Sequence, residues 1–325
     1  MGGDNLSLRG VFNPALYHGG SKRRDFFEGW YFKFVNAQKT RSCAFIPGVS
    51  LGKRDEEPHA FVQFLSGKES RADNFTFSYD QFKYDKKVFS ISVGKNSFSL
   101  DRVTLALESG ENEIRGELEI IDPFLWPRKI LSPGIMGPFT FVPFMECYHG
   151  VVSMDHNLRG SIAVNGDNWD FSGGRGYIEK DWGKSFPKAW IWMQSNNFDE
   201  PKVSVMLSIA TIPWLKGAFT GFLCGLLLKD RLYRFTTYTG AKLAGIDVSR
   251  EKVDIQIMMK ELLLKISAHR TDGAGLLSPV MGSMKGRIDE TLTSEIHITL
   301  LEGSKKIFEG TGSDAGLEVV GELKI

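Results

Sequence analysis

Alternation of polar and apolar residues is the feature that most constrains the fold of this chain of 325 residues. Clear examples are FTFSYDQFKY (75–84), KVFSISV (87–93), EIRGELEII (113–121) and SEIHITLLE (294–302). Successive side chains of a strand point to opposite faces, so such runs predict β-strands with one buried face. Turn-like sequences, among them SGEN, VNGDN and SGGRG, separate the runs. Many short strands at close spacing predict an all-β sandwich or barrel.

One segment is ambiguous between helix and strand. The sequence KVDIQIMMKELLLKISA (252–268) has apolar residues at helical spacing, but its first half also alternates. We therefore predict strand for this segment.

Two pairs of short sequences indicate an internal repeat. LSPGIMG (131–137) returns as LSPVMG (277–282), and SGGRGYIE (172–179) has a later counterpart in GSDAGLEV (312–319). One such pair would arise easily by chance, but two pairs in the same order favour two related domains in tandem. We expect the break between them near residues 165–180.

Each half of the chain also begins with a strand-like segment that carries tryptophan, GWYFKFV (29–35) and AWIWMQSNNF (189–198). A tryptophan on the first strand is typical of calyx-like barrels. We therefore predict two tandem lipocalin-like β-barrels or curled antiparallel sheets. Their predicted ranges are 1–170 and 171–325, with a cleft at their junction, where ligand sites often form.

Charge and motif content exclude several classes of function. A net charge of +1 and the lack of a long basic run give no reason to expect a nucleic-acid partner. No Gly-x-Gly-x-x-Gly fingerprint, P-loop or Gly-x-Ser-x-Gly elbow occurs at a suitable place, so we expect no nucleotide cofactor. The three cysteines, Cys43, Cys147 and Cys224, lie too far apart for a zinc site or redox dithiol.

The cysteine count and the hydrophobicity of the sequence indicate the cellular compartment. An odd cysteine count favours a reducing compartment, and the N-terminus shows no apolar core of a secretory signal. The most apolar run, residues 217–228, is shorter than the about 20 residues that span a bilayer. We expect a cytoplasmic protein, with peripheral contact to a membrane left open.

The segment YHGGSKRRDFFEGWYFK (17–33) is the first candidate site. In a strand, Glu28 and Trp30 share one face, and a carboxylate beside an indole on an inward face would be desolvated, which raises its pKa. The alternative is a first strand with a plugging tryptophan and Glu28 paired with Arg23 or Arg24 at the rim. The residues alone favour neither interpretation.

The segment GYIEKDWGKSFPKAWIWMQSNNF (176–198) is the second. Alternation places Tyr177, Glu179 and Asp181 on one face, and Lys180 and Trp182 on the other. These residues could form an ion-paired hinge followed by core tryptophans. They could equally form an acid in an aromatic cage, where a neutral carboxylic acid donates a proton and the rings stabilise a cation by up to ~2 kcal/mol.

The third segment, MECYHGVVSMDHNLRG (145–160), contains His149 and His156. Its spacing matches no known closed metal site, and a lone strand histidine is more often a core or rim residue. We predict no metal.

At these residues the chain resembles the tocopherol cyclase family. Tyr17-His18-Gly19, the basic pair and FFEGWYF (26–32) resemble that family's N-terminal signature, and GLEVVG near the C-terminus also fits. About 150 residues after FFEGWYF comes a stretch similar to the family's central signature: Glu179-Lys180, Trp182-Gly183, Phe186-Pro187, Trp190, Trp192, Gln194 and Asn196 or Asn197. The chain begins without a plastid transit peptide, so it resembles a prokaryotic relative.

The resemblance implies a reaction, the cyclisation of a prenylated quinol to a chromanol. An alkene takes a proton and the ring hydroxyl closes onto the resulting cation, so no redox cofactor is needed. A more distant similarity to lipocalin-like carotenoid hydratases associates Tyr177, Glu179 and an upstream histidine, here His149, with proton chemistry. The position of Asp181 is not reliably acidic in the plant cyclase pattern, which favours Glu179 as the acid.

These resemblances give each residue an expected role. Glu179 would donate the proton, Tyr177, His149 and Asp181 would position it or accept the phenolic proton, and Glu28 is the reserve acid. The predicted substrate-binding residues are Trp30, Tyr31, Trp182, Trp190, Trp192, Gln194 and Asn196. The expected partner is a lipophilic small molecule. The alternatives are hydration or pericyclic cyclisation of another isoprenoid or polyene, and a carrier of an apolar ligand without enzymatic activity.

Overall fold

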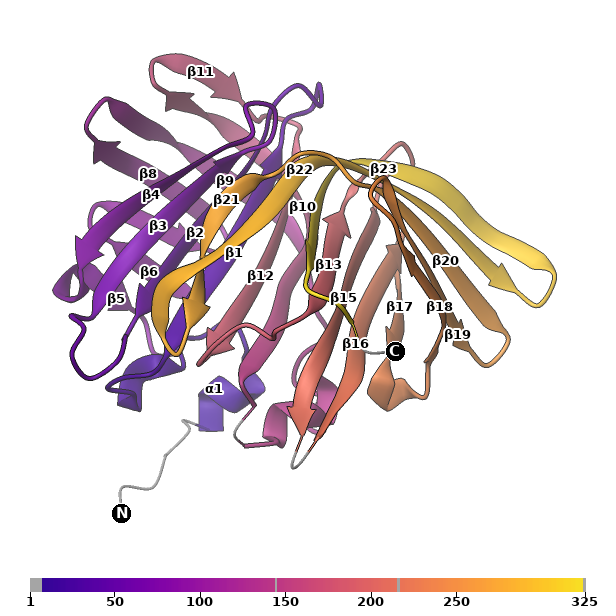
Figure 1. Cartoon of the computed structure of the whole chain (residues 1–325). Coiled ribbons are helices and arrows are strands. Elements are labelled where there is room, and N and C mark those ends of the chain that lie inside the picture. The colour runs from indigo at the N-terminus through magenta and orange to yellow at the C-terminus, as the bar shows by residue number, and fades with distance from the viewer. Residues whose placement is uncertain (1–7, 144, 215–216, 324–325) are drawn as a thin grey trace. The chain divides into compact units, whose positions relative to one another are not determined.

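The structure, a computed structural model, describes residues 8–143, 145–214 and 217–323. Over these residues the chain is almost entirely β-structure, in one 12-stranded and one 11-stranded antiparallel sheet (Figure 1). The predicted all-β, lipocalin-like fold class is confirmed. The ambiguous segment 252–268 forms two strands, β19 (Lys252–Met259) and β20 (Leu262–His269), as predicted. No helix within the described ranges is long and apolar enough to cross a membrane.

The chain divides into two compact units. The first comprises residues 1–66, 72–186 and 276–287, and the second comprises residues 67–71, 187–275 and 288–325. The predicted boundary after residue 170 therefore lies too early. Residues 175–183 form a strand, β12, that is hydrogen-bonded between β1 and β10 inside the first sheet.

The first sheet and the short helices beside it come from the N-terminal half of the chain. The elements are α1 (Leu8–Phe12), η1 (Gly19–Ser21), β1 (Phe27–Val35), β2 (Ser42–Ser50), β3 (His59–Ser66), β4 (Arg71–Ser78), η2 (Tyr79–Gln81), β5 (Phe82–Tyr84), β6 (Ser90–Val93), β7 (Asn96–Ser99), β8 (Arg102–Ser109), β9 (Asn112–Leu125), η3 (Gly137–Phe141), β10 (Cys147–Val164), β11 (Asp167–Asp170) and β12 (Arg175–Gly183). Their order in the sheet is β4-β3-β2-β1-β12-β10-β9-β8-β7-β6-β5, and β11 pairs with β10.

This sheet curls into a nearly closed barrel because its apolar residues need a common core. Phe32 on β1 and Phe98 on β7 are five steps apart in the strand order, which in a flat sheet would separate them by roughly 24 Å. Their ring centroids are 5.3 Å apart, and both side chains are fully buried in one cluster. Alternation along β1 therefore sends Trp30, Phe32 and Phe34 into the barrel.

The second half of the chain returns one hairpin to the first unit. Residues 276–287 contain the end of β21 (Ala274–Val280) and the start of β22 (Ser283–Glu302), and they lie on β2 and β3 (Figure 1). The Gln63 side chain bonds both backbone groups of Leu277, at 2.7 and 3.1 Å, and the Ser50 hydroxyl donates to the Gly282 carbonyl at 2.7 Å.

This hairpin corrects one part of the repeat argument. The second copy of the LSP sequence, at 277–282, lies in the first unit together with the first copy at 131–137. The two copies also differ locally, because Pro133 lies outside any strand and Pro279 lies within β21. Short Pro/Gly strings specify turns rather than a fold, so their likeness carried no information on domains.

The second sheet is formed by the remaining strands. They are β13 (Trp190–Ser195), β14 (Asn197–Phe198), β15 (Val203–Trp214), β16 (Gly217–Leu228), β17 (Arg231–Thr236), β18 (Lys242–Val248), β19, β20, β21, β22 and β23 (Lys305–Val320), with η4 (Thr237–Thr239) after β17. The order is β17-β16-β15-β13-β23-β22-β20-β19-β18. This sheet also curls, since Phe235 of β17 and Ile255 of β19 share one core.

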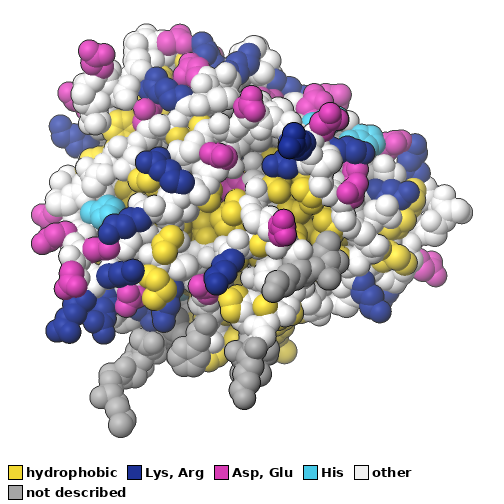
Figure 2. Space-filling view, in the orientation of Figure 1, with side chains coloured by type: hydrophobic (Ala, Val, Ile, Leu, Met, Phe, Trp, Pro, Cys, Tyr) yellow, Lys and Arg dark blue, Asp and Glu magenta, His cyan; other side chains and the backbone are white. Residues whose placement is uncertain are grey.

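The two sheets share one local arrangement. In each, a tryptophan-bearing strand pairs antiparallel with a later strand: β1 with β12, and β13 with β23. The Gly-rich corner that begins at residue 172 leads into β12, whereas its counterpart at 312–319 lies within β23, so the predicted second corner is wrong. Glu179 on β12 lies opposite Tyr31, and Glu318 on β23 lies opposite Trp192. On the face drawn in Figure 2, positive and negative side chains are interspersed.

We predict that Phe98→Ala destabilises the protein by about 3–5 kcal/mol, because it leaves a cavity where β7 packs against Phe32 of β1. The measurement is the urea concentration at the midpoint of unfolding, monitored by circular dichroism. Val88→Ala, at a side chain that is 60% exposed, is the control and should change stability by less than about 0.5 kcal/mol. Equal effects of the two substitutions would contradict the proposed core.

Candidate functional site

The candidate site is built on strand β12, whose two faces carry different chemistry. β1 and β10 flank β12 on either side, and both pairings are antiparallel. Ile178 and Trp182 belong to the barrel core, so the face that includes Lys180 points inward. Tyr177, Glu179 and Asp181 project from the opposite, outer face. The alternation predicted for this segment is therefore confirmed.

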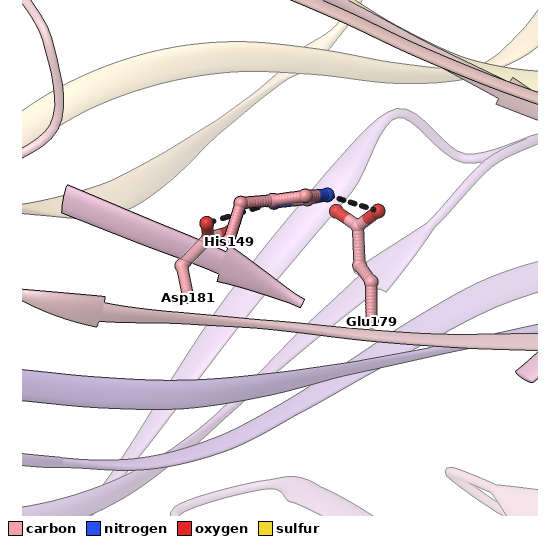
Figure 3. Close-up of side chains that lie close together, drawn as sticks. All are labelled: His149, Glu179 and Asp181. Atoms are coloured by element: carbon pink, nitrogen blue, oxygen red, sulfur yellow. Dashed lines mark hydrogen bonds and ion pairs between the residues drawn. The ribbon is translucent and has the colours of Figure 1, made fainter. Parts of the chain in front are cut away.

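On the outer face, His149 of β10 lies between the two acids of β12 (Figure 3). Its Nδ1 is 2.9 Å from Asp181 Oδ1, and its Nε2 is 3.6 Å from Glu179 Oε2. The strand register explains this geometry, because His149 and Asp181 are direct cross-strand partners. Tyr177 completes the group by donating its hydroxyl hydrogen to Glu179 Oε2 at 2.6 Å.

Burial differs along this row of polar groups. The Glu179 side chain is 5% exposed, that of His149 12% and that of Asp181 25%. The row therefore runs from a buried acid, through an imidazole, to a carboxylate that reaches solvent. Such a row can pass a proton between solvent and a buried carboxyl group.

The neighbours of Glu179 across the strands are mostly apolar. The register places Tyr31 of β1 on one side of Glu179 and Val151 of β10 on the other. Directly opposite side chains in a sheet lie about 5 Å apart, so both flank the acid on the outer face. Asp181 has Gly29 as its partner on β1, and this glycine adds no side chain beside the carboxylate.

Tyr177 is fully buried, and burial is the main cause that holds its pKa well above the usual value, followed by the charge of Glu179. The phenol therefore remains protonated at any pH at which the protein would be assayed. Its role toward Glu179 is that of a hydrogen-bond donor.

His149, Glu179 and Asp181 also form a set that could hold a metal ion. Their ligand atoms all lie within 4.8 Å of one another, and one imidazole with two carboxylates is a donor set that divalent metals accept. Among the described residues this is the one such group. The prediction of no metal therefore needs an experiment.

The inner face of the same strands carries a second, separate cluster. The ammonium of Lys180 forms an ion pair with Glu28 and lies 2.8 Å from His18 Nδ1. It also donates to the backbone carbonyls of Pro14, at 2.9 Å, and Leu16. The backbone amide of His18 donates to Glu28 at 2.9 Å. These contacts attach the segment from Pro14 to His18 to the inner face of β12 and β1.

Aromatic rings enclose the Lys180 ammonium. The indoles of Trp30 and Trp182 lie 4.7 and 4.8 Å from Nζ, and the His18 ring stacks on Trp182 at 4.3 Å. Complete burial lowers the pKa of Lys180 to about 8, although the Glu28 carboxylate opposes this shift. Burial also opposes ionisation of Glu28, but Lys180 and His18 outweigh it, so the pKa of Glu28 lies below its usual value.

This cluster corrects three predictions from the sequence. Glu28 is paired with Lys180, not with Arg23 or Arg24, and it is held ionised rather than neutral. It lies on the opposite face of the sheet from Glu179, so the structure does not support it as a reserve acid.

The tryptophans of the first unit are corrected in the same way. Trp30 and Trp182 were expected to line the pocket of the acid, but they point into the barrel. Trp30 is fully buried against Phe82 and Phe89, and its indole donates to the Ala15 carbonyl at 2.9 Å. The plugging tryptophan was the alternative left open for this strand, and the structure favours it.

Of the other predicted binding residues, Tyr31 lies on β1 opposite Glu179, and the remaining four lie in the second unit. Trp190, Trp192 and Gln194 share one face of β13, and Asn196 follows that strand. All four are buried, and the Trp190 indole donates to Glu318 of β23 at 2.6 Å. Their expected contribution to substrate binding stays a prediction.

Sequence reasoning missed Lys180 and His18 as partners of Glu28. A signal was present, because Lys180 alternates with Ile178 and Trp182, two residues of core type. A lysine in such a row needs a buried counter-ion, and Glu28 was the acid with matching neighbours.

The fold of the chain is shared with solved structures of lipocalin-like barrel proteins. The crystal structure of CghA superposes with a TM-score of 0.57 at 9% identity, covering 92% of this chain and 90% of that protein. An AttH-like protein of Nitrosomonas europaea gives a TM-score of 0.54 at 13% identity and covers 98% of this chain and 97% of that protein. Identities this low show the fold alone.

The sequence assigns the family. Residues 108–321, more than half of the chain, match the family model described as tocopherol cyclase-like, and the protein belongs to that family. The match includes the segment around Glu179 and begins after FFEGWYF (26–32), so the N-terminal resemblance lies outside it.

Two plant proteins of similar sequence have low identity to this chain. A probable chloroplastic tocopherol cyclase of Oryza sativa subsp. japonica is 25% identical over 207 residues, which cover 57% of this chain and 42% of that protein. The chloroplastic tocopherol cyclase of Zea mays is 26% identical over 119 residues, covering 35% and 24%. The chain thus spans less than half the length of these relatives.

We predict that Glu28→Gln destabilises the protein by about 3–5 kcal/mol, because it leaves the Lys180 ammonium buried without its counter-ion. The readout is the urea midpoint. Glu117→Gln breaks an exposed pair with Arg102 on the same sheet, and it should cost no more than about 1 kcal/mol. A Glu28→Gln variant as stable as Glu117→Gln would show that the buried pair is unimportant.

Proposed function

We propose that the protein is a cofactor-independent cyclase that converts a prenylated quinol to a chromanol by acid catalysis. Membership of the tocopherol cyclase-like family supports the reaction class. The observation that carries the proposal is the row Asp181–His149–Glu179–Tyr177, in which a buried carboxyl group is linked by an imidazole to a more exposed carboxylate.

In the proposed reaction Glu179, in its neutral form, gives its proton to the less substituted carbon of the trisubstituted alkene. The electron pair of the double bond forms the new C–H bond, and a tertiary cation remains. The ring hydroxyl oxygen then bonds to this cation and loses its proton to the Glu179 carboxylate or to His149. Reactant and product are isomers, no electrons are transferred, and the acid is regenerated.

The neighbours of Glu179 each assist one step. The Tyr177 hydroxyl holds one carboxyl oxygen, at 2.6 Å, and so orients the acid toward the substrate. Asp181 fixes the His149 ring through Nδ1 and leaves Nε2 directed at Glu179. The ring of Tyr31, across the strand from Glu179, is suitably placed to stabilise the cation.

The substrate class follows from the same proposal. A carbocation survives only where water is scarce, and Glu179 is almost completely buried beside Tyr31 and Val151. We propose a lipophilic quinol with an isoprenoid tail. The structure of CghA with Sch210972, with a TM-score of 0.57 to this chain, supports a ligand-binding role for a protein of this fold.

We predict that purified protein converts a prenylated hydroquinone to a product of equal mass, and that Glu179→Gln lowers kcat roughly 10²- to 10⁴-fold because the proton donor is lost. Product formation is followed by liquid chromatography and mass spectrometry. Glu117→Gln, an exposed glutamate of β9, is the matched control and should retain wild-type turnover.

Three results would speak against this assignment. Full turnover of Glu179→Gln would exclude Glu179 as the acid. A product heavier by one water would indicate hydration in place of cyclisation. Tight binding without any change in substrate mass, across several tail lengths, would indicate a carrier.

The metal-free mechanism predicts that dialysis against EDTA leaves turnover unchanged. Added Zn²⁺ should inhibit, because occupation of the His149, Glu179 and Asp181 donor set removes the acid. The assay is initial rate against metal concentration, with metal content checked by mass spectrometry. Loss of activity in EDTA that Mg²⁺, Mn²⁺ or Zn²⁺ restores would overturn the metal-free proposal.

A further inference from the structure

A tight turn after β9 presents two aliphatic side chains to solvent. Lys129 and Ser132 form an isolated antiparallel bridge in which each backbone amide donates to the other residue's carbonyl at 3.0 Å. Ile130 and Leu131 lie at the tip and are 78% and 79% exposed. Among the described large apolar side chains, the next most exposed is Val88, at 60%. We name residues 128–132 the docking turn.

The composition of this tip is unusual for a turn. Gly, Asn, Asp and Ser normally occupy such positions, because they fit turn geometry and interact well with water. Two aliphatic residues that are more than three-quarters exposed on a hydrogen-bonded turn have an unfavourable hydration cost. The bridge fixes the two ends of the turn, and both aliphatic side chains face solvent at its tip.

The sequence on either side of the tip carries charge of one sign. Between Asp122 and Glu146 the only charged residues in the sequence are Arg128 and Lys129, and both are exposed. They directly precede Ile130 and Leu131. Basic side chains behind an apolar tip complement a surface that is anionic outside and apolar beneath.

The segment that follows the turn reaches the candidate site. Met136 is buried, and its sulfur accepts the backbone N–H of His149 at 3.1 Å. The Tyr148 hydroxyl donates to the Val142 carbonyl at 2.8 Å. The docking turn is thus attached, through residues 133–142, to the strand that carries His149.

We propose that the docking turn binds an anionic bilayer surface, with Ile130 and Leu131 inserted among the acyl chains and Arg128 and Lys129 at the lipid headgroups. A protein partner fits less well, because stable interfaces bury about 800 Å² per partner and centre on aromatic anchors in pockets. The tip offers only two aliphatic side chains. This proposal is independent of the cyclase reaction, since it concerns binding to lipid alone.

The test is flotation of the full chain with phosphatidylcholine vesicles, with and without phosphatidylserine, in the absence of any substrate. The wild-type protein should bind the vesicles that contain phosphatidylserine, and added salt should weaken binding. Arg128→Gln with Lys129→Gln should weaken it roughly 30-fold. Ile130→Ser with Leu131→Ser should weaken it at least about tenfold.

The chain offers a matched control in the turn that contains Lys86, Lys87 and Val88, three exposed residues of similar type. Substituting them by Gln, Gln and Ser should leave vesicle binding unchanged. Thermal melts show whether each variant is folded. No binding by the wild-type protein, or an equal loss in the control variant, would overturn the proposal. Failure of the cyclase assay would not affect it.

Discussion

The ion pair between Lys180 and Glu28 fixes the orientation of the strand on which the candidate site depends. A slip of β12 by one residue would turn every inner side chain to the outer face and every outer one into the barrel. Such a slip would move the Lys180 ammonium out of its cage of indoles and carbonyls and would place Glu179 and Asp181 in the barrel core. Both changes leave buried charges without partners, which costs several kcal/mol each. The inner pair therefore keeps the two acids of the outer face beside His149.

How far the sequence predicts this arrangement depends on the range of the interactions. Alternation is local, so the strands and the two faces of β12 follow from the residues alone. The pairing of Lys180 with Glu28 joins residues about 150 positions apart, and no local pattern specifies it. The prediction for Trp30 is wrong for the same reason, because whether its face lines the core or a pocket depends on which way the sheet curls. The predicted domain boundary is wrong because β12 comes after a Gly-rich corner yet pairs back with β1.

The fold and the chemistry of this protein rest on different observations. Barrels of this kind are shared by proteins only 9–13% identical to this chain, so the architecture by itself indicates no reaction. The proposed reaction rests on a few side chains, with Glu179 as the acid and His149 linking it to solvent. The docking turn adds a separate element, because Ile130 and Leu131 contribute nothing to the core and are held away from it. A protein that takes a lipophilic quinol from a bilayer would need both features on one unit.

Protonation of the alkene is the central claim, and isotope incorporation tests it most directly. The reaction is run in D₂O with a prenylated hydroquinone, and the isolated chromanol is analysed by mass spectrometry and NMR. If Glu179 exchanges its proton with solvent through His149 and then donates it, the product carries one deuterium. That deuterium lies on the ring methylene adjacent to the tertiary carbon that bears the new C–O bond. A chromanol without deuterium at that carbon would contradict proton donation, and the account of Glu179 would then be wrong.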